Sequence, residues 1–450
     1  MLYRETPDAP YSPEVSTRIS LNAKRLLDPY YQMPAVFQEE NCDWPGDKEG
    51  RALLAFVSHY KISGDINPCM PALLEEMPNR TCQDLYFGPL AGEVIFEQQL
   101  SGHSWLLRGL CEHYEQFLDE FSLKALKSIT QGLYLPTKGH YRTYPIDRTI
   151  QNEGDVSGHS NTVINEWNLS TDIGCAFMAI DGLSHVYKIT KDPEVKALLD
   201  EMITVFCAID KYALQAQTHC TLTAARGMIR LYNITEDPKY LVGAKDIFSL
   251  YAFGKGMDAT YQNVNWWGRP DTWTEPCAIV DSLMVALELY KITRKDSYRR
   301  CATRIFHNGL ASAQRANGGA GTDSIVIPEN GQNTLYMKMY EAPFCCTMRL
   351  AEGLWYIHAN VDMLYYELEY KGDGTLWIVR DEYGRYMCGD LVLCEAYLPE
   401  DVDTQGWEMP EPVAERHGHK LIPLIKFYKT PDSVATRIQQ RVIFEKKVRK

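Results

Sequence analysis

Residues 187–192 read Tyr-Lys-Ile-Thr-Lys-Asp, and close copies follow as Tyr-Asn-Ile-Thr-Glu-Asp at 232–237 and Tyr-Lys-Ile-Thr-Arg-Lys-Asp at 290–296. Each copy ends one run with apolar residues at helical spacing and precedes another. Its Thr and Asp are residue types that cap the start of a helix. The repeating unit is therefore predicted to be two helices joined by a turn. We expect first helices at 172–189, 219–234 and 277–292, and second helices at 193–212, 238–253 and 297–314.

Helical hairpins of this size either stack into an open solenoid or close into a ring of paired helices. In this sequence, reactive side chains gather at the start of each first helix. They are Glu166, Trp167 and Asp172; His219 and Cys220; and Glu275 and Cys277. A closed ring brings equivalent helix starts to one rim, whereas a solenoid spreads them along a ridge. We therefore expect a mainly α fold, an (α/α)6-type toroid as in six-hairpin glycosidases, with a site at its mouth.

The pattern changes to period two after Asn360, which predicts antiparallel strands. The expected strands lie at 365–370, 376–380, 385–388, 391–393, 421–428 and 433–443. A chain of 450 residues exceeds what one core usually supports. We therefore expect a catalytic toroid domain at 1–360 and a smaller β-sandwich-like domain at 361–450.

The composition limits the kinds of binding partner and the cellular compartment that we expect for this protein. A net charge of −13 argues against nucleic acid or an anionic membrane as a partner. The first residues lack the basic and apolar regions of a secretory signal, and no apolar run could span a membrane. Thirteen cysteines, an odd number, favour free thiols in a reducing, cytoplasmic setting. Whether a signal was removed, and whether the chain forms a homo-oligomer, stay open.

Two short stretches are expected to meet in the fold: Thr-Glu-Pro-Cys at 274–277 and Phe-Cys-Cys-Thr at 344–347. Neighbouring cysteines cannot easily form a disulfide with each other, because the backbone would be strained. Three thiolates and a carboxylate would make a four-ligand zinc site. The alternatives are buried free thiols beside an unrelated Glu-x-Cys, or a disulfide. A thiol at a helix start, as expected for Cys345, also has a lowered pKa.

Thr-Glu-x-Cys-Ala at a helix start, the later Cys-Cys and a trailing β region together resemble the β-L-arabinofuranosidase superfamily, glycoside hydrolase families 127 and 146. The resemblance covers roughly residues 100–360. It implies that Glu275, Cys277, Cys345 and Cys346 bind Zn²⁺. The Gly-His at 102–103, His219 and the His-Asn-Gly at 307–309 match further family elements, which implies that His103, His219 and His307 contact the substrate.

The resemblance also implies a mechanism in which Cys345 is the nucleophile. Zinc keeps the thiol deprotonated, and the thiolate adds to the anomeric carbon. Water then resolves the thioglycosyl enzyme with net retention, as in the two-step carboxylate mechanism.

The sequence departs from the family at the general acid. The family has a Glu about sixteen residues before its Glu-x-Cys, but residues 258–271 contain none. Asp258 and Asp271 are the candidates, and Asp271 has a structural alternative as an Asp-Thr before the helix. The same loop carries Trp266, Trp267 and Trp273, which either stack on sugar rings or simply pack between hairpins. The β region is also shorter than usual in the family, so the sugar need not be β-L-arabinofuranose.

From these features we predict a retaining glycoside hydrolase acting on a β-L-arabinofuranoside-like furanoside or a related plant or pectic sugar. One alternative is a non-catalytic or altered carbohydrate-binding member with structural zinc. Another is a sugar epimerase on the same toroid that uses histidines as acid and base.

Overall fold

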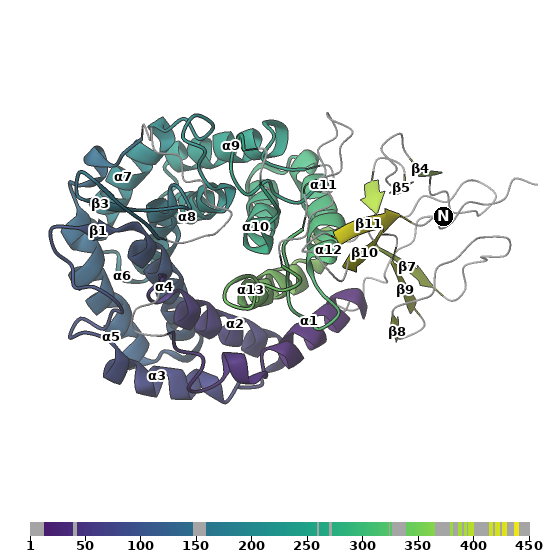
Figure 1. Cartoon of the computed structure of the whole chain (residues 1–450), viewed down its shortest axis with the longest axis horizontal. Coiled ribbons are helices and arrows are strands. Elements are labelled where there is room, and N and C mark those ends of the chain that lie inside the picture. Colours follow the sequence, from purple (N-terminus) through teal and green to yellow (C-terminus); the bar gives the residue numbers. More distant parts are fainter. Residues whose placement is uncertain are drawn as a thin grey trace, which may run out of the picture.

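The computed structural model describes residues 13–38, 43–146, 159–258, 261–269, 272–323, 325 and 339–364, and eight short strands between 379 and 440. Helices arranged in a ring dominate it (Figure 1). Among the described residues, no helix has both the length and the apolar character that a membrane span needs.

Six inner helices form the wall of the ring. They are α2 (Asp47–Ser63), α4 (Glu97–Phe117), α6 (Ala179–Thr190), α8 (Thr218–Thr235), α10 (Pro276–Thr293) and α13 (Cys346–His358). Each packs against the next, and α13 packs back against α2, so the ring is closed. The expectation of a toroid rather than a solenoid is confirmed.

Each inner helix packs against an outer helix. The outer helices are α3 (Cys69–Arg80), α5 (Glu120–Ile129), α7 (Pro193–Ala208), α9 (Pro238–Phe253), α11 (Asp296–Arg304) and α1 (Pro13–Arg25). The first five follow their inner partners in the chain. The sixth pair joins the two ends of the toroid, because α1 packs against α13.

The repeated turns cap their helices as predicted in two of the three copies. The carboxylates of Asp192 and Asp237 accept hydrogen bonds from the backbone N–H of Glu194 and Lys239, and each is followed by a proline at the first helical position. In the third copy the residue before α11 is Lys295, which makes no side-chain cap.

Three predicted helix boundaries were wrong. The second helix of the first copy, expected to reach residue 212, ends at Ala208. The second helix of the third copy does not run to residue 314: α11 ends at Arg304, a π-helical turn covers Ile305–Leu310, and α12 is only Ala311–Ala313. The helix expected from residue 172 begins later, with a 3-10 turn at Cys175–Met178 before α6. Sequence periodicity alone does not reveal such changes of winding.

A small sheet lies beside the toroid wall. Strand β3 (Trp167–Ser170) pairs in parallel with β1 (Ile95–Phe96) and antiparallel with β2 (His159–Ile164). Trp167 is therefore a strand residue and not part of a helix start. The sheet is tied to α4, because the Glu97 carboxylate accepts a hydrogen bond from the backbone N–H of Ser170 at 2.7 Å.

The strands after the toroid are short and antiparallel, as the period-two pattern predicts. Their order is β4-β5-β6, β7-β9-β8 and β10-β11. The strands are β4 (Val379–Arg380), β5 (Tyr386–Cys388), β6 (Leu391–Leu393), β7 (Glu395–Pro399), β8 (Ala414–Arg416), β9 (His419–Pro423), β10 (Ile425–Lys429) and β11 (Thr436–Gln440). The strand expected at 365–370 lies outside the described residues, and the domain boundary at 360 stays a prediction.

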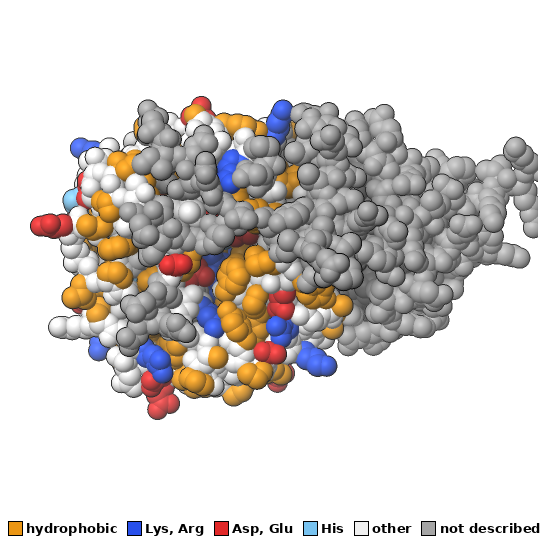
Figure 2. Space-filling view, viewed as in Figure 1, with side chains coloured by type: hydrophobic (Ala, Val, Ile, Leu, Met, Phe, Trp, Pro, Cys, Tyr) orange, Lys and Arg blue, Asp and Glu red, His pale blue; other side chains and the backbone are white. Residues whose placement is uncertain are grey.

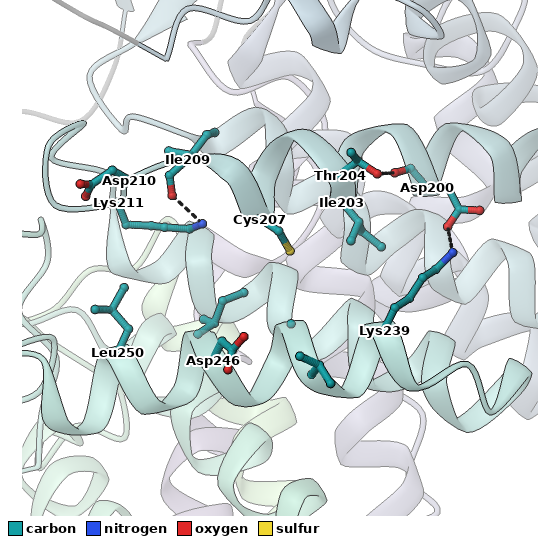
Figure 3. Close-up of a pocket in the computed structure, with 13 residues that line it drawn as sticks. Asp200, Ile203, Thr204, Cys207, Ile209, Asp210, Lys211, Lys239, Asp246 and Leu250 are labelled. Atoms are coloured by element: carbon teal, nitrogen blue, oxygen red, sulfur yellow. Dashed lines mark hydrogen bonds and ion pairs between the residues drawn. The ribbon is translucent and has the colours of Figure 1, made fainter.

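The outer surface of the toroid is mixed in character. On the face shown in Figure 2, acidic and basic side chains are interspersed among apolar ones over the helical part. A groove of about 520 Å³ separates the outer helices α7 and α9 (Figure 3). In it, the Lys211 ammonium donates to the carbonyls of Phe206 and Ile209 and so binds the C-terminal end of α7.

Candidate metal centre and active site

The two cysteine-bearing stretches meet at one end of the ring. Glu275 is the N-cap residue of α10 and Cys277 lies in its first turn, while Cys345 is the N-cap residue of α13 and Cys346 begins it. These two inner helices pack against each other. One ligand atom from each of the four residues lies within 4.8 Å of the other three. The juxtaposition expected from the sequence is therefore present.

The sulfur atoms are close but not bonded. Cys277 Sγ lies 3.5 Å from Cys346 Sγ, which lies 3.4 Å from Cys345 Sγ. All three cysteines are free thiols, whereas a disulfide would need about 2.05 Å. Tetrahedral zinc with Zn–S bonds of about 2.3 Å separates its sulfurs by about 3.8 Å, so small shifts would accommodate the ion.

The four side chains differ in their access to solvent. Cys277 and Cys346 are buried, whereas Cys345 is half-buried and the Glu275 side chain is 13% exposed. Cys345 is thus the least buried residue of the three cysteines, although its sulfur is itself enclosed in the cluster.

Without a cation the three thiols resist ionisation. The bond with Cys277 lowers the pKa of Cys345, but the bond with Cys346 and burial outweigh it and raise this pKa well above its usual value. The lowered pKa expected from its place at a helix start was therefore wrong for the metal-free thiol. Burial also raises the pKa of Cys277 and Cys346. Three thiolates and a carboxylate at this spacing need positive charge between them. A soft, borderline ion such as Zn²⁺ suits three sulfurs and one oxygen, so the residues fit the metal.

His219 connects the cluster to the interior of the ring. Its Nδ1 lies 3.1 Å from Glu275 Oε1, its Nε2 lies 3.3 Å from Asp281 Oδ2, and its ring stacks on Trp105. Burial by itself lowers the pKa of His219, but the two carboxylates outweigh burial and raise it. The geometry makes His219 an orienting partner of Glu275.

The Glu275 position is fixed by further contacts. Its backbone N–H donates to Asn263 Oδ1 at 2.6 Å, and its Oε2 lies 3.4 Å from Gln217 Nε2. Both partners come from segments outside α10. The carboxylate is thus held from several sides, as metal-binding carboxylates usually are.

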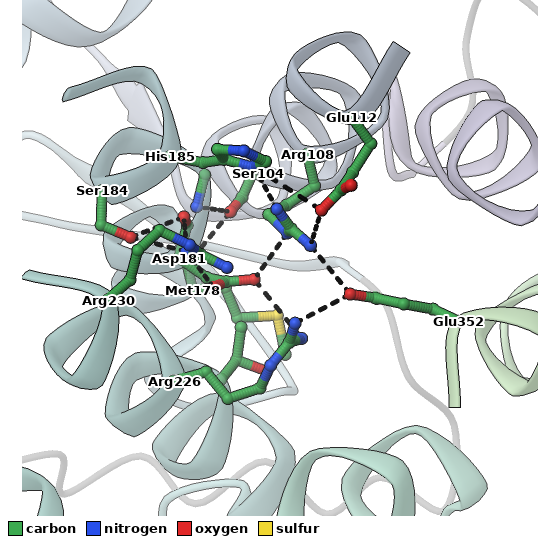
Figure 4. A network of polar contacts seen from close by, with 12 residues as sticks. Ser104, Arg108, Glu112, Met178, Asp181, Ser184, His185, Arg226, Arg230 and Glu352 are labelled. Atoms are coloured by element: carbon green, nitrogen blue, oxygen red, sulfur yellow. Dashed lines mark hydrogen bonds and ion pairs between the residues drawn. The ribbon is translucent and has the colours of Figure 1, made fainter. Parts of the chain in front are cut away.

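Below the cluster, the centre of the toroid is filled with ion pairs (Figure 4). Glu352 accepts from Arg108 at 2.8 Å and from Arg226 at 2.9 Å, and also pairs with Arg349. Asp281 joins this network through Arg226 and Arg349. Burial would raise the pKa of Asp281, but Arg349 and Arg226 hold it well below its usual value. Asp281 is therefore a carboxylate at neutral pH.

His103 does not reach the cluster through its ring nitrogens. Its Nδ1 lies 2.8 Å from the carbonyl of Gln99, and its Nε2 accepts from the backbone N–H of Phe87 at 2.9 Å. Burial lowers its pKa to about 4, so the ring is neutral. Both nitrogens are used by the backbone, which favours a positioning role for His103 over substrate contact.

The tryptophans of the loop before α10 are packed inside. Trp266 and Trp267 are fully buried: Trp266 meets Trp273 edge to face at 4.6 Å, and Trp267 packs on Tyr212 at 5.6 Å. No face of either ring is open to a sugar in this conformation. Packing between hairpins, the alternative that the sequence leaves open, accounts for these two residues.

The structure says less about three other predicted site residues, Asp258, Asp271 and His307. Asp258 is buried, and its carboxylate accepts from the backbone N–H of Gln262 in the turn after α9. Asp271 and the side chain of His307 lie outside the described residues. Their roles stay predictions.

Sequence reasoning missed two neighbours of the cluster, Asp281 and Arg51. Arg51 in the first turn of α2 donates to Cys277 Sγ at 3.5 Å. Each of the two residues has a feature in the sequence that could have drawn attention to it. Asp281 interrupts an apolar run in a predicted inner helix, and Arg51 lies four residues after Asp47 on one helix face.

Comparisons with known proteins agree with this fold. No family model and no curated protein matches the sequence. A D-mannose isomerase is similar over 80% of this chain and 100% of its own, with a TM-score of 0.51 and 12% identity. A β-arabinofuranosidase of glycoside hydrolase family 127 is similar over 77% of this chain, with a TM-score of 0.49 and 13% identity, and the chain spans 56% of that enzyme. A cellobiose 2-epimerase from Bacillus thermoamylovorans has a TM-score of 0.48 at 13% identity, over 77% of this chain and 100% of its own.

At such identities the likeness concerns the fold alone. The chain is a mainly helical (α/α)6 toroid with additional short strands. What the site does has to be argued from its own residues.

Proposed function

We propose that the protein is a retaining glycoside hydrolase in which Cys345 is the nucleophile. One observation carries the proposal: four side chains able to bind zinc converge on two adjacent helix starts, and Cys345 is the least buried residue of the three cysteines. Zinc, when bound, would keep that sulfur deprotonated at neutral pH. Glu275, Cys277, Cys345 and Cys346 would be its ligands.

The chemistry then takes two displacements at one carbon. The Cys345 thiolate attacks the anomeric carbon, the bond to the leaving oxygen breaks, and an acid gives that oxygen a proton. In the second step water attacks the same carbon, the carbon–sulfur bond breaks and the conjugate base takes the proton. Two inversions give net retention.

The substrate class is proposed from the motif resemblance: a β-L-arabinofuranoside-like furanoside or a related plant or pectic sugar. The D-mannose isomerase with the same fold also acts on a sugar, which agrees with this class without carrying it. The packed Trp266 and Trp267 rings offer no stacking platform, so we expect hydrogen-bonding groups at the mouth to bind the sugar.

For the acid we propose Asp271 ahead of Asp258. Asp271 lies four residues before the ligand Glu275, whereas the Asp258 carboxylate is engaged in its own turn. Loss of a general acid lowers the rate by about 10²–10⁴, least for a substrate whose leaving group needs no proton. Because Asp271 would also be the base of the second step, Asp271→Asn should release nitrophenol from a nitrophenyl glycoside in a single-turnover burst and then turn over slowly, whereas an alkyl glycoside should give no burst. Asp258→Asn should turn over both substrates.

The nucleophile is tested by Cys345→Ser in zinc-loaded protein against a panel of aryl furanosides. We expect turnover to vanish and the folded state to persist. Full activity of Cys345→Ser would refute the assignment. An inactive wild type that still binds zinc would favour the altered, carbohydrate-binding alternative.

A further inference from the structure

Among the described residues, the Arg51 guanidinium donates a hydrogen bond to a sulfur of the thiol cluster. Its Nη1 donates to Cys277 Sγ at 3.5 Å, and the side chain is 5% exposed. Sulfur accepts hydrogen bonds at longer distances than oxygen, so the contact is a charge-assisted one. A guanidinium stays protonated even when buried.

Two neighbours fix the direction of this guanidinium. Asp47 Oδ2 accepts from Arg51 Nε at 2.8 Å across one turn of α2, and the Arg51 guanidinium lies 4.1 Å from the centre of the Trp105 ring. Both side chains of the ion pair are nearly buried. An arginine held by a carboxylate and an aromatic face loses little freedom when it bonds a third group.

The close approach of α2 and α4 makes this arrangement possible. A Cβ at Gly50 would overlap the backbone of Trp105 and Leu106, and one at Gly102 would overlap the Pro45 carbonyl. Gly46, the N-cap residue of α2, has a φ of +82° and lies against the His103 ring. The glycines therefore let α2 lie directly on α4, so that Arg51 reaches over Trp105.

The charge of a loaded site explains why such a residue is needed. Three thiolates and a carboxylate exceed the charge of Zn²⁺ by two. Arg51 supplies positive charge on the thiolate side, and His219 lies on the carboxylate side. A hydrogen bond from a fixed donor to a metal-bound sulfur tunes how tightly that sulfur binds the metal and how reactive it is.

We propose that Arg51, oriented by Asp47 and Trp105, is a positioning residue of the metal–thiolate centre that strengthens metal binding and directs reactivity to Cys345. Its hydrogen bond falls on buried Cys277 and draws electron density from that sulfur. Arg51 does not bond the Cys345 sulfur, which therefore keeps its nucleophilicity. The role rests on the proposed function of this site, but its test reads metal binding directly.

The test measures zinc affinity of the full chain by competition with a chelator, and the visible spectrum after Co²⁺ replaces Zn²⁺. For Arg51→Met we expect a 10- to 100-fold weaker affinity, as for other outer partners of metal ligands, and a shifted sulfur-to-cobalt charge-transfer band. Arg51→Lys keeps the charge without the planar fork, so its affinity should lie between those of Arg51→Met and the wild type.

Two further variants keep the result interpretable. Arg51→Met leaves the Asp47 carboxylate buried without its partner, so Asp47→Asn/Arg51→Met is measured as well and should show the same loss of affinity. Arg230→Met is the matched control, because Arg230 pairs with Asp181 and Ser184 in the ionic centre instead of with a ligand. It should bind zinc as the wild type does.

The outcomes separate this role from the proposed activity. Wild-type affinity and an unshifted Co²⁺ band in both Arg51→Met variants would overturn the role of Arg51, whatever the turnover. Weaker binding in them but not in Arg230→Met supports that role, even in a protein without hydrolase activity. A wild type that binds no metal would overturn both.

Discussion

His219 Nδ1 lies 3.1 Å from Glu275 Oε1, and this contact joins the candidate metal centre to the buried ionic core of the toroid. On the opposite edge of the imidazole, His219 Nε2 faces Asp281. Arg226 and Arg349 keep Asp281 in its carboxylate form. The chain of contacts runs from Glu275 at the start of α10 to the middle of the inner helices. Such outer partners orient ligands and raise their affinity for metal.

Replacement of His219 should therefore weaken metal binding. For His219→Asn we expect about a 10- to 100-fold lower zinc affinity, because Glu275 loses an orienting partner. Chelator competition measures it. His103→Asn is the matched control, because His103 bonds only backbone groups in the contacts described above. It should lower the free energy of unfolding by about 1–3 kcal/mol and leave zinc affinity unchanged. Equal affinities for both variants and the wild type would contradict this role of His219.

The fold was largely predictable because its signal is repeated. The Thr-Asp turns at 190–192 and 235–237 predicted the helical hairpins, and the clustering of reactive residues at helix starts predicted a closed ring. The signal fails where winding changes, as at Ile305–Leu310, because a single π-helical turn is too short to leave a periodic pattern of its own. The pairing of α1 with α13 carries no local sequence signal, since it joins the two ends of the toroid.

The tight packing of α2 on α4 makes a second prediction. Gly50→Ala should lower the free energy of unfolding by about 1–3 kcal/mol or more, because the new Cβ overlaps the backbone of α4. Gly92→Ala is the control, since its Cβ would meet the Leu90 carbonyl at an ordinary 3.8 Å. Urea unfolding of both variants measures the difference. A Gly50→Ala protein as stable as Gly92→Ala would show that the helices are not in such close contact.

Of the candidate site, the four side chains that could bind a metal were predictable, and their surroundings were not. Glu-x-Cys and Cys-Cys are local patterns that report ligand chemistry directly. The contacts of His103 and Trp266 depend on tertiary packing, which turned both residues inward. Arg51 belongs to α2, far from the cysteine motifs in sequence, and only the closed ring brings it to the cluster. Asp281 lies one turn after Cys277 on α10, but its contact with His219 depends on the packing of α8 against α10.

Glu49 should make stability depend on pH. It is 1% exposed, burial raises its pKa to about 7, and its Oε1 accepts from the backbone N–H of Gln38. The pKa of Glu49 is near 4.5 in the unfolded chain and about 7 in the folded protein. The folded state therefore loses stability as the pH rises from about 4.5 to about 7. Glu49→Gln keeps the acceptor and removes the titration.

The difference between wild type and variant isolates this effect. We expect the free energy of unfolding of Glu49→Gln, relative to wild type, to rise by about 3 kcal/mol between pH 4.5 and 7.5 and to level off above. Urea titrations across this range measure it. A constant difference would mean that Glu49 ionises normally.

The central claim concerns the metal, and X-ray absorption at the zinc edge of the zinc-loaded full chain tests it most directly. One zinc per chain, with three sulfur ligands at about 2.3 Å and one oxygen ligand at about 2.0–2.2 Å, is the predicted result. Loss of one sulfur in Cys345→Ser should accompany it. A zinc ion with no sulfur ligands, or a chain that takes up no zinc, would contradict the claim.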